Sequence, residues 1–472
     1  MRRKTKIIAT IGPATGSYPA IERMYEAGMS IVRLNMSHAT HDEAASVINW
    51  VKTLNRKVRY AVPIMLDTQG PEIRTGVLAE SLRLAAGETV FLDVEPQPEA
   101  TTRPPSIAVD YPDLPDAVGV GDRVRLDNGL LNVDVVARVG DRLQCRVVDG
   151  GTLGSRKHVN LPGVALNLPA LTAKDRTDIA FGLEHEIDYV ALSFARSPGD
   201  IEELRDLLGP KGARTVKVIA KIENQQGVAN ATDIARAADG VMVARGDLGI
   251  ETDIAALPIM QRRLVETSVR LGKRCIVATH LLESMVDNPI PTRAEVTDVA
   301  NAVYEGVDAI MLSGETAIGK YPVRCVEQLA NIAEASERQQ GFGLHQALAI
   351  DTAKQHLARA AVQLADAIGA AGIVVITRRG ITADAVTNCR PERVPIFAFT
   401  NLSQTRRRLM LNRGVFAHRT AFSSDPEKTI RTALKVLRER EGVPSDGRVV
   451  VISDVLAQTA VDAIQLRRVG DD

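Results

Sequence analysis

The feature that most constrains the fold of this chain is a rhythm of short apolar runs that alternate with amphipathic segments through roughly the first 320 residues. The eight runs are Ile7 to Ile11, Ile31 to Leu34, Val62 to Leu66, Tyr189 to Leu192, Val216 to Ala220, Val241 to Ala244, Cys275 to Ala278 and Ala309 to Leu312. Each run has the length of a buried strand, and helix signals such as the capping box Thr292-Arg293-Ala294-Glu295 lie between the runs. This pattern predicts an α/β fold of the (β/α)8 TIM-barrel type, whose chemistry lies at the carboxyl ends of the strands.

One connection in this rhythm is far longer than the others. Between the third and fourth runs lie about a hundred residues in which glycine and proline separate short β-type pieces, such as Arg123 to Leu126 and Leu143 to Val148. A structureless loop of that length is implausible inside a compact domain. We therefore predict a small β-barrel domain, inserted at the catalytic end of the barrel, where it could serve as a lid.

Helix and strand patterns alternate again in the last part of the chain, with strands at Ile373 to Ile376, Ile396 to Phe399 and Val449 to Ile452. They predict an open α/β sheet of parallel character. The predicted domains are the catalytic barrel at residues 1–69 and 171–345, the inserted β-domain at 70–170, and a C-terminal α/β regulatory domain at 346–472.

Charge and composition give no reason to propose nucleic acid or a membrane as a partner. Lys plus Arg and Asp plus Glu both number 58, and no apolar run approaches the length of a membrane span. The basic start Met1-Arg2-Arg3-Lys4 is not followed by the core of a signal peptide, and the four cysteines form no Cys-x-x-Cys pair. We expect a cytoplasmic protein.

Charged residues follow two neighbouring apolar runs, as Lys221-Ile-Glu223-Asn224 and Arg245-Gly246-Asp247-Leu248-Gly249. Side chains alternate along a strand, so Lys221 and Glu223 share one face, as do Arg245 and Asp247. Paired carboxylates suit a hard divalent ion such as Mg²⁺, held together with a phosphorylated or enolisable ligand. The alternative for either motif alone is a surface salt bridge.

A second group of polar residues follows the runs nearer the start of the chain. Arg33, Asn35 and Ser37 share one strand face by their spacing, and Asp67 ends the third run. Their oxygens form a plausible cage for a cation, while Arg33 and Arg74 could bind phosphate oxygens. Taken singly, each arginine is more often a solvated or salt-bridged side chain.

Together these motifs resemble those of pyruvate kinase. The stretches that carry the resemblance are IIATIGP at Ile7 to Pro13, RLNMSH at Arg33 to His38, LDTQGPEIRT at Leu66 to Thr75, VNLPG at Val159 to Gly163, KIEN at Lys221 to Asn224, RGDLG at Arg245 to Gly249, ATHLLESM at Ala278 to Met285 and MLSGETA at Met311 to Ala317. The match runs in order from residue 4 to about residue 340. It implies a barrel, a β-domain inserted after the third strand, and a C-terminal α/β domain.

The resemblance also implies an activity, namely transfer of the phosphoryl group of phosphoenolpyruvate to ADP, which gives pyruvate and ATP. Glu223 and Asp247 would coordinate Mg²⁺ (or Mn²⁺), and Lys221 would lie on the transferring phosphoryl group. Thr279 matches the threonine near the methylene carbon, where the enolate is protonated by its hydroxyl or by a neighbouring water. The Gly246 and Asp247 backbone amides would receive the substrate carboxylate.

The same resemblance assigns a monovalent cation site and a nucleotide site. Asn35, Ser37, Asp67 and Thr68 match the K⁺ ligands, and Glu72 stands where K⁺-dependent members carry glutamate and K⁺-independent members carry lysine. We therefore predict dependence on K⁺.

By the same resemblance, Arg33 belongs with the catalytic and substrate-binding residues. Asn35, His38, Arg74 and, from the inserted domain, Lys157 would bind nucleotide or the transferred phosphate.

In the C-terminal domain, Thr377, Arg378, Arg379 and Thr382 lie where family members bind an effector phosphate. An ordinary strand-to-helix loop is the alternative. The glycine-rich loop that often grips fructose 1,6-bisphosphate is replaced by Ser453 to Ala460, so we hypothesise that an effector is a monophosphorylated sugar or nucleotide instead.

Two other functions remain open from the residues alone. An aldolase-type lyase acting on pyruvate enolate could use Glu223 and Asp247 in a similar metal site, but it has no nucleotide for Lys157 to bind. A catalytically silent relative would have lost Lys221, Glu223, Asp247 or Thr279, and none is lost. The resemblance further implies an allosteric homotetramer.

Overall fold

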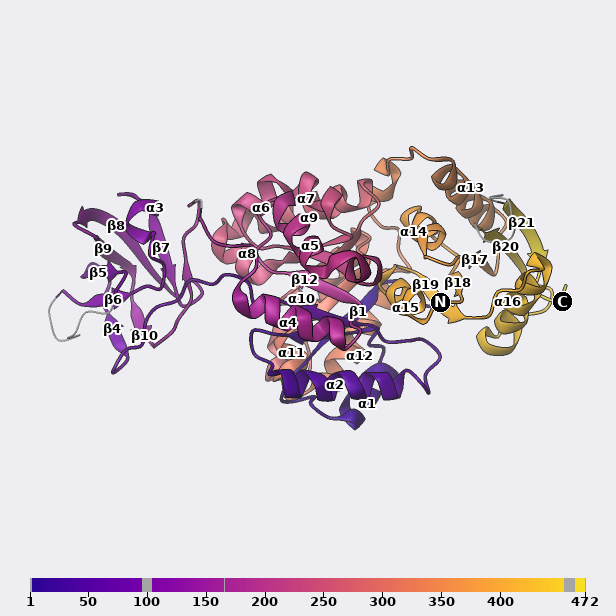
Figure 1. Ribbon diagram of the computed structural model, residues 1–472, viewed down its shortest axis with the longest axis horizontal. Coiled ribbons are helices and arrows are strands. Elements are labelled where there is room, and N and C mark those ends of the chain that lie inside the picture. The colour runs from indigo at the N-terminus through magenta and orange to yellow at the C-terminus, as the bar shows by residue number, and fades with distance from the viewer. Residues whose placement is uncertain (1, 96–103, 165, 454–462, 472) are drawn as a thin grey trace.

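The barrel predicted from the eight apolar runs is present, closed and parallel. The computed structural model describes residues 2–95, 104–164, 166–453 and 463–471, and the barrel lies between a β-domain and an α/β domain (Figure 1). The barrel strands are β1 (Lys6–Ile11), β2 (Ile31–Asn35), β3 (Ile64–Asp67), β12 (Tyr189–Leu192), β13 (Lys217–Ile222), β14 (Gly240–Ala244), β15 (Arg274–Ala278) and β16 (Ala309–Leu312). Pairing of β1 with β16 closes the ring, which confirms the predicted barrel.

Helices cover the outside of the barrel. The longer ones are α1 (Tyr18–Glu26), α2 (His41–Leu54), α4 (Ala173–Glu184), α5 (Pro198–Thr215), α7 (Ala231–Ala237), α9 (Leu257–Arg270), α10 (Arg293–Tyr304) and α12 (Pro322–Ser336). Shorter helical segments are α6 (Gln225–Ala229), α8 (Arg245–Glu251), α11 (Gly314–Ala317), η1 (Ile254–Ala256), η2 (Glu283–Val286) and η3 (Leu344–Ala347). The predicted capping box begins α10, since the Thr292 hydroxyl accepts a hydrogen bond from the Glu295 amide.

An apolar cluster fills the lumen of the barrel. Its members are Ile8, Ile31, Met65, Tyr189, Ala191, Ile219, Met242, Ile276, Ala278, Ala309, Met311 and Leu411. All of them except Leu411 belong to barrel strands, and Leu411, which is fully buried, comes from the C-terminal domain. A side chain from another domain therefore helps to fill the barrel.

The long insertion forms a β-domain with a core of its own. Its elements are β4 (Leu82–Leu84), β5 (Thr89–Asp93), β6 (Ser106–Ala108), α3 (Leu114–Ala117), β7 (Arg123–Leu126), β8 (Leu131–Val139), β9 (Arg142–Asp149), β10 (Gly151–Leu153) and β11 (Val159–Asn160). Over the described residues the strands pair in a six-stranded sheet, β11-β7-β8-β9-β5-β6, and a two-stranded sheet, β10-β4. The structure therefore confirms a separate β-domain after the third barrel strand, and over the described residues β4 pairs with β10 apart from the larger sheet.

The C-terminal domain is an open α/β sheet, as predicted. Its elements are α13 (Ala353–Ala367), β17 (Gly372–Ile376), α14 (Ile381–Asn388), β18 (Ile396–Thr400), α15 (Ser403–Arg408), η4 (Leu409–Leu411), β19 (Val415–Arg419), α16 (Pro426–Glu441), β20 (Arg448–Ser453) and β21 (Ala463–Arg468). The strand order is β19-β18-β17-β20-β21, with β21 antiparallel to β20 and the other pairs parallel. Strand β21 was not predicted from the sequence. Most of the segment Ser453 to Ala460 lies outside the described residues.

Arginine-rich contacts join this domain to the amino-terminal end of the barrel. Helix α15 lies on the side of the domain that faces the barrel (Figure 1), and the Arg407 Nε is 2.8 Å from Asp188 Oδ1. Asp308, at the start of β16, is fully buried between two arginines, with Arg274 NH1 at 2.9 Å and Arg390 NH1 at 2.7 Å. Burial alone would raise the pKa of Asp308, but Arg274 and Arg390 outweigh that effect and hold the pKa below its ordinary value.

Substitution of Asp308 tests how much this ion cluster contributes to stability. Asp308→Asn leaves two buried guanidiniums without their carboxylate, so we expect the free energy of unfolding at neutral pH to fall by about 3–5 kcal/mol. Because the folded-state pKa of Asp308 is depressed, its contribution is present above the ordinary aspartate pKa and is lost as the pH falls toward the folded-state pKa. Denaturant unfolding of the unmodified protein and of Asp308→Asn should therefore show that the difference between their free energies of unfolding becomes smaller as the pH falls through this range. The matched control is Asp446→Asn, since Asp446 is exposed; an equal loss in that variant would contradict the assignment.

Candidate active site

Three charged residues singled out in the sequence, Arg33, Asp67 and Lys221, form a polar layer with Thr10 and Ser193 directly above the lumen cluster. Each lies two positions beyond a lumen residue, on the same strand or, for Ser193, directly after its end, and side chains alternate along a strand, so both point inward. The pairs are Ile8 and Thr10, Ile31 and Arg33, Met65 and Asp67, Ala191 and Ser193, and Ile219 and Lys221. The carboxyl end of the barrel therefore presents polar groups above an apolar floor.

Lys221 is the centre of this layer. Its Nζ lies 3.0 Å from Asp67 Oδ1 and 3.1 Å from Glu223 Oε1, and it donates a hydrogen bond to Ser193 Oγ at 2.7 Å. All four side chains are buried. Burial alone would lower the pKa of Lys221, but Asp67 and Glu223 outweigh it and the pKa lies above its ordinary value. The lysine is therefore a fixed positive charge.

Asp67 joins Lys221 to a second cation. The Arg33 Nε lies 2.6 Å from Asp67 Oδ2, and Arg33 also donates to Thr10 Oγ1 at 2.9 Å. Burial would raise the pKa of Asp67, but Arg33 and Lys221 together lower it. The aspartate thus stays ionised and holds both cations in place.

Glu223 and Asp247 form the carboxylate pair of the site. Burial raises the pKa of Glu223, the nearby charge of Lys221 lowers it, and the like charge of Asp247 raises it again, so the net direction is upward. The Phe194 amide donates to Glu223 Oε2 at 2.7 Å, which fixes the carboxylate. Two carboxylates that raise each other's free energy in this way suit a cation, and their oxygens are the ligands that Mg²⁺ prefers.

Among the described residues, no group of three or more His, Cys, Asp or Glu side chains could hold a metal ion by itself. A divalent ion on Glu223 and Asp247 would therefore need further oxygen ligands from water or from a bound substrate. This arrangement is typical of Mg²⁺, which is usually bound through one or two carboxylates plus phosphate and water.

Gly246 and Thr279 bring the start of α8 against the end of β15. The Arg245 NH2 donates to the Thr279 carbonyl at 2.6 Å, and its NH1 pairs with Asp298 at 2.7 Å. A Cβ added to Gly246 would lie 3.1 Å from Thr279 Cγ2. Thr279 has a φ of 71°, a left-handed backbone conformation that is uncommon for threonine. The close approach and the unusual backbone together fix the Thr279 side chain beside the α8 amides.

The predicted K⁺ ligands lie on adjacent strand ends. Asn35 is in register with Asp67 across β2 and β3, and the Asn35 side-chain oxygen accepts a hydrogen bond from the Ser37 amide at 3.3 Å. The Thr68 carbonyl accepts a hydrogen bond from Ser193 at 2.6 Å. The four predicted ligands therefore come from one short stretch of the barrel rim.

The predicted nucleotide residues are less closely gathered. The Arg74 NH2 lies 2.6 Å from Glu72 Oε2, and the Lys157 Nζ lies 3.1 Å from Asp127 Oδ1 within the β-domain. The His38 amide donates to the Asn35 carbonyl at 3.2 Å. These contacts do not join Arg74 or Lys157 to the Lys221 cluster, and they leave both cations on the β-domain side of the site.

The predicted effector residues lie elsewhere, at the end of β17 and the start of α14. Thr377 and Thr382 are buried, whereas Arg378 and Arg379 are exposed. Gly380, between Arg379 and Ile381, has a φ of 92°, a backbone conformation that residues with an L side chain rarely adopt.

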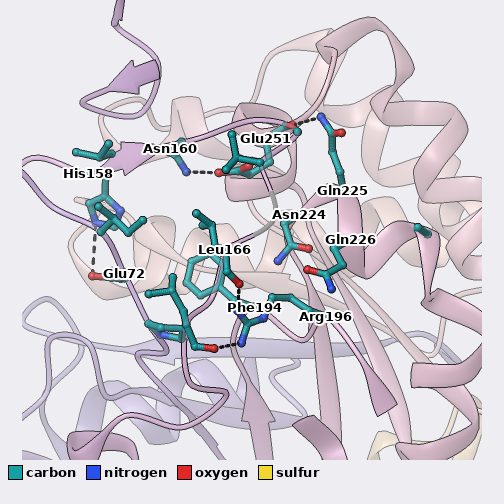
Figure 2. Close-up of a pocket in the computed structure, with 17 residues that line it drawn as sticks. Glu72, His158, Asn160, Leu166, Phe194, Arg196, Asn224, Gln225, Gln226 and Glu251 are labelled. Carbon is teal, nitrogen blue, oxygen red and sulfur yellow. Dashed lines mark hydrogen bonds and ion pairs between the residues drawn. The ribbon is translucent and has the colours of Figure 1, made fainter. Parts of the chain in front are cut away.

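A cavity of about 350 Å³ lies beside the site, between the β-domain linkers and the barrel rim (Figure 2). Asn160 Nδ2 donates to Glu251 Oε1 at 2.7 Å, and Arg196 donates to the Leu166 carbonyl at 3.0 Å. Phe194, whose amide holds Glu223, forms part of the wall. The cavity therefore lies between the segments that lead to the β-domain and Phe194, the residue whose amide holds Glu223.

Ser193 and Thr10 are site residues that sequence reasoning missed. Ser193 follows the strand Tyr189–Leu192 directly, so its position at a strand end was a usable signal. Thr10 lies inside the motif at Ile7 to Pro13, but an isolated threonine in an apolar run gives no indication of an arginine partner.

Two models of one protein family match this chain, "Pyruvate kinase, barrel domain" over residues 2–326 and "Pyruvate kinase, alpha/beta domain" over residues 355–464. The chain belongs to the pyruvate kinase family. A pyruvate kinase of Geobacillus stearothermophilus is 40% identical over 464 residues, which cover 96% of this chain and 78% of that protein. A pyruvate kinase of Dictyostelium discoideum is 39% identical over 468 residues, covering 96% and 91%. The plastidial pyruvate kinase 2 of Arabidopsis thaliana is 37% identical over 478 residues, covering 99% and 82%.

Membership of the pyruvate kinase family confirms the resemblance drawn from the motifs. The match includes the C-terminal α/β domain, which the lyase alternative leaves unexplained. No helix in the described part of the chain is both long and apolar enough to cross a membrane.

The contact between Gly246 and Thr279 gives a direct test of this geometry. Gly246→Ala places a methyl group against Thr279, whose strained backbone has little freedom to move, so we expect kcat to fall by about tenfold or more. Gly249→Ala is the matched control on the same helix, because its new methyl group would meet the flexible ends of Ile254 and Leu257. Steady-state kinetics of both variants should separate them, and equal kcat values would contradict the proposed packing.

Proposed function

We propose that this chain transfers the phosphoryl group of phosphoenolpyruvate to ADP, giving pyruvate and ATP, with the residues of the layer above the barrel lumen. The observation that carries the proposal is the buried cluster in which Lys221 lies within 3.1 Å of both Asp67 and Glu223. Such a cluster supplies a fixed positive charge beside a carboxylate pair, which is what phosphoryl transfer from an enol phosphate requires.

In this proposal Glu223 and Asp247 hold a divalent ion, Mg²⁺ or Mn²⁺, which supplies Lewis-acid stabilisation of negative charge when bound. The Phe194 amide orients Glu223 for this role, since it holds one carboxylate oxygen at 2.7 Å. The Gly246 and Asp247 amides, at the first turn of α8, bind the substrate carboxylate.

Lys221 and Arg33 act on the transferring phosphoryl group. The ammonium of Lys221 stabilises negative charge on the phosphoryl oxygens as the group moves, and the guanidinium of Arg33 binds two of those oxygens through its planar donors. Asp67 contacts both cations, so it is a positioning residue for Lys221 and Arg33.

Thr279 lies beside the α8 amides and hence beside the proposed position of the enolate. We propose that proton delivery to the methylene carbon takes place there, from the threonine hydroxyl or from a water that it holds. The close packing of Gly246 on Thr279 supports this placement.

The nucleotide is bound by Asn35, His38, Arg74 and Lys157. Arg74 and Lys157 lie on the β-domain side of the site, so closure of that domain would carry the two cations toward the transferred phosphate. In the proposal, the present pairing of Lys157 with Asp127 and of Arg74 with Glu72 is exchanged for phosphate contacts on closure.

The remaining parts of the proposal concern cations, regulation and cellular context. Asn35, Ser37, Asp67 and Thr68 bind K⁺, and a phosphorylated effector binds near Thr377 and Thr382. We further propose a cytoplasmic, allosteric homotetramer that binds neither nucleic acid nor membrane. The domain limits at residues 69 and 70, 170 and 171, and 345 and 346 are part of the same proposal.

Replacement of the central lysine tests the catalytic role. Lys221→Met removes charge stabilisation that is strongest in the transition state, so we expect kcat to fall by about 10²–10³-fold with a much smaller change in KM. The variant is compared after circular dichroism shows that it is folded, because it also leaves Asp67 and Glu223 without their cation. Lys320→Met is the control, since Lys320 pairs on the surface with Asp287. A change confined to KM would show that the assigned role is wrong.

Dependence on K⁺ is tested by ion replacement. We expect activity in tetramethylammonium chloride to be lower than in KCl by about tenfold or more, because the site loses one positive charge. Glu72→Lys should restore part of the activity in K⁺-free buffer, since its ammonium can substitute for the ion, whereas Glu72→Gln should not. Full activity of the unmodified enzyme without K⁺ would rule out the prediction.

A further inference from the structure

A cavity of about 210 Å³ lies at the opposite end of the barrel from the active site, where the C-terminal domain meets the barrel. Positively charged side chains from both domains line it, with Lys217, Lys273 and Arg274 from the barrel and Arg379 and Arg408 from the C-terminal domain. Arg379 belongs to the loop between β17 and α14, and Arg408 ends α15. The cavity thus brings cations together from five separate positions of the chain.

Two of these cations already have carboxylate partners, each of which also pairs with a further arginine. The Lys217 Nζ lies 2.7 Å from Asp239 Oδ1, and the Arg274 NH1 lies 2.9 Å from the buried Asp308. Lys217 and Arg274 therefore attract a further anion less strongly than an unpaired cation would.

The other three cations form no ion pair within the described part of the chain. The Lys273 Nζ donates only to the Ala238 and Arg236 carbonyls, at 2.7 and 3.0 Å. Arg408 donates to the Arg214 carbonyl at 2.9 Å, and its Nε is buried with no hydrogen-bond partner. Arg379 has neither a hydrogen bond nor an ion pair to any residue that the structure describes.

One carboxylate of the lining, Asp384, opposes these charges. It accepts a hydrogen bond from Asn412 at 2.7 Å and, over the described residues, pairs with no cation. Three unpaired cations against one unpaired carboxylate leave about two positive charges. This excess matches a doubly charged anion.

We propose that this cavity binds a phosphoryl group, either of inorganic phosphate or of a small phosphate ester, between Lys273 and the two arginines. The planar guanidiniums of Arg379 and Arg408 suit the oxygens of a phosphate, and the Lys273 ammonium supplies a point charge from the barrel side. Such a ligand joins the two domains. The site rests on the proposed effector loop only through Arg379, and it requires no step of the proposed reaction.

The test compares neighbouring arginines of the same loop in the full chain. Isothermal titration and thermal unfolding are measured with inorganic phosphate against chloride at equal ionic strength, in the unmodified protein and in Arg379→Gln and Arg378→Gln. Arg378 belongs with Arg379 to the predicted effector residues but does not line the cavity, so its variant separates binding in the cavity from binding elsewhere on the effector loop. We expect phosphate to raise Tm, Arg379→Gln to weaken binding by at least about tenfold, and Arg378→Gln to leave it unchanged.

A barrel-side variant, Lys273→Gln, should weaken phosphate binding as Arg379→Gln does, because the proposed site spans both domains. Titration with glucose 6-phosphate distinguishes the two ligand sources. Tighter binding of the ester than of phosphate, abolished by Arg379→Gln, supports the site with an ester as its ligand, and equal binding supports it with phosphate.

Three outcomes would overturn the proposal. They are the absence of phosphate binding to the unmodified protein, unchanged binding in both Arg379→Gln and Lys273→Gln, and loss of binding in Arg378→Gln alone. The last would place the anion on the other side of the effector loop. Kinase activity, measured separately in phosphate-free buffer, reports on the proposed reaction and does not depend on any of these results.

Discussion

The active site depends on the burial of an ammonium group among carboxylates at the top of an apolar lumen. Lys221 and Glu223 follow Ile219 on one strand, and Asp67 follows Met65 on another, so the floor that excludes water and the charges above it are set by the same strands. Removing one charge from such a cluster leaves the others buried and uncompensated, which costs about 3–5 kcal/mol. Loss of one of these charges therefore lowers the free energy of unfolding, and the positions of the charged groups are set before any ligand binds.

Unusual backbone conformations cluster at the same end of the barrel. Phe194 has a φ of 53°, Thr279 of 71° and His280 of 55°, and all three follow barrel strands. Such conformations cost about 1–3 kcal/mol each and persist where the surrounding structure holds them. Here they have identifiable consequences, because the Phe194 amide reaches Glu223 and the Thr279 carbonyl reaches Arg245. The strained conformations therefore orient the Phe194 amide toward Glu223 and the Thr279 carbonyl toward Arg245.

The sequence predicted the barrel strands and the main charged cluster because both follow from local periodicity. Apolar runs mark strands, and residues at strand ends converge wherever the strands close into a ring, so Lys221 and Glu223 could be placed together at the carboxyl end of the barrel. Asp67 was expected in a separate cation cage, and its ion pair with Lys221 was not predicted. Ser193 was missed because nothing in its own neighbourhood indicates that it contacts Lys221. The strand Ala463–Arg468 and the pairing of the β-domain in two sheets were missed for a related reason, since partner choice between strands depends on contacts distant in sequence.

Leu411 links the C-terminal domain to the apolar residues beneath the candidate active site. Leu411 packs in the lumen cluster together with Tyr189 and Ile219, and the Tyr189 hydroxyl donates to the Arg408 carbonyl in the same segment. Ile219 in turn lies two residues before Lys221. A ligand that moved the segment from Arg408 to Leu411 would act on the apolar residues beneath Lys221, because a close-packed core transmits displacement. The segment from Arg408 to Leu411 therefore contacts the barrel both at the interface with the C-terminal domain and inside the lumen. A displacement at that interface could reach the residues beneath Lys221 through these contacts alone.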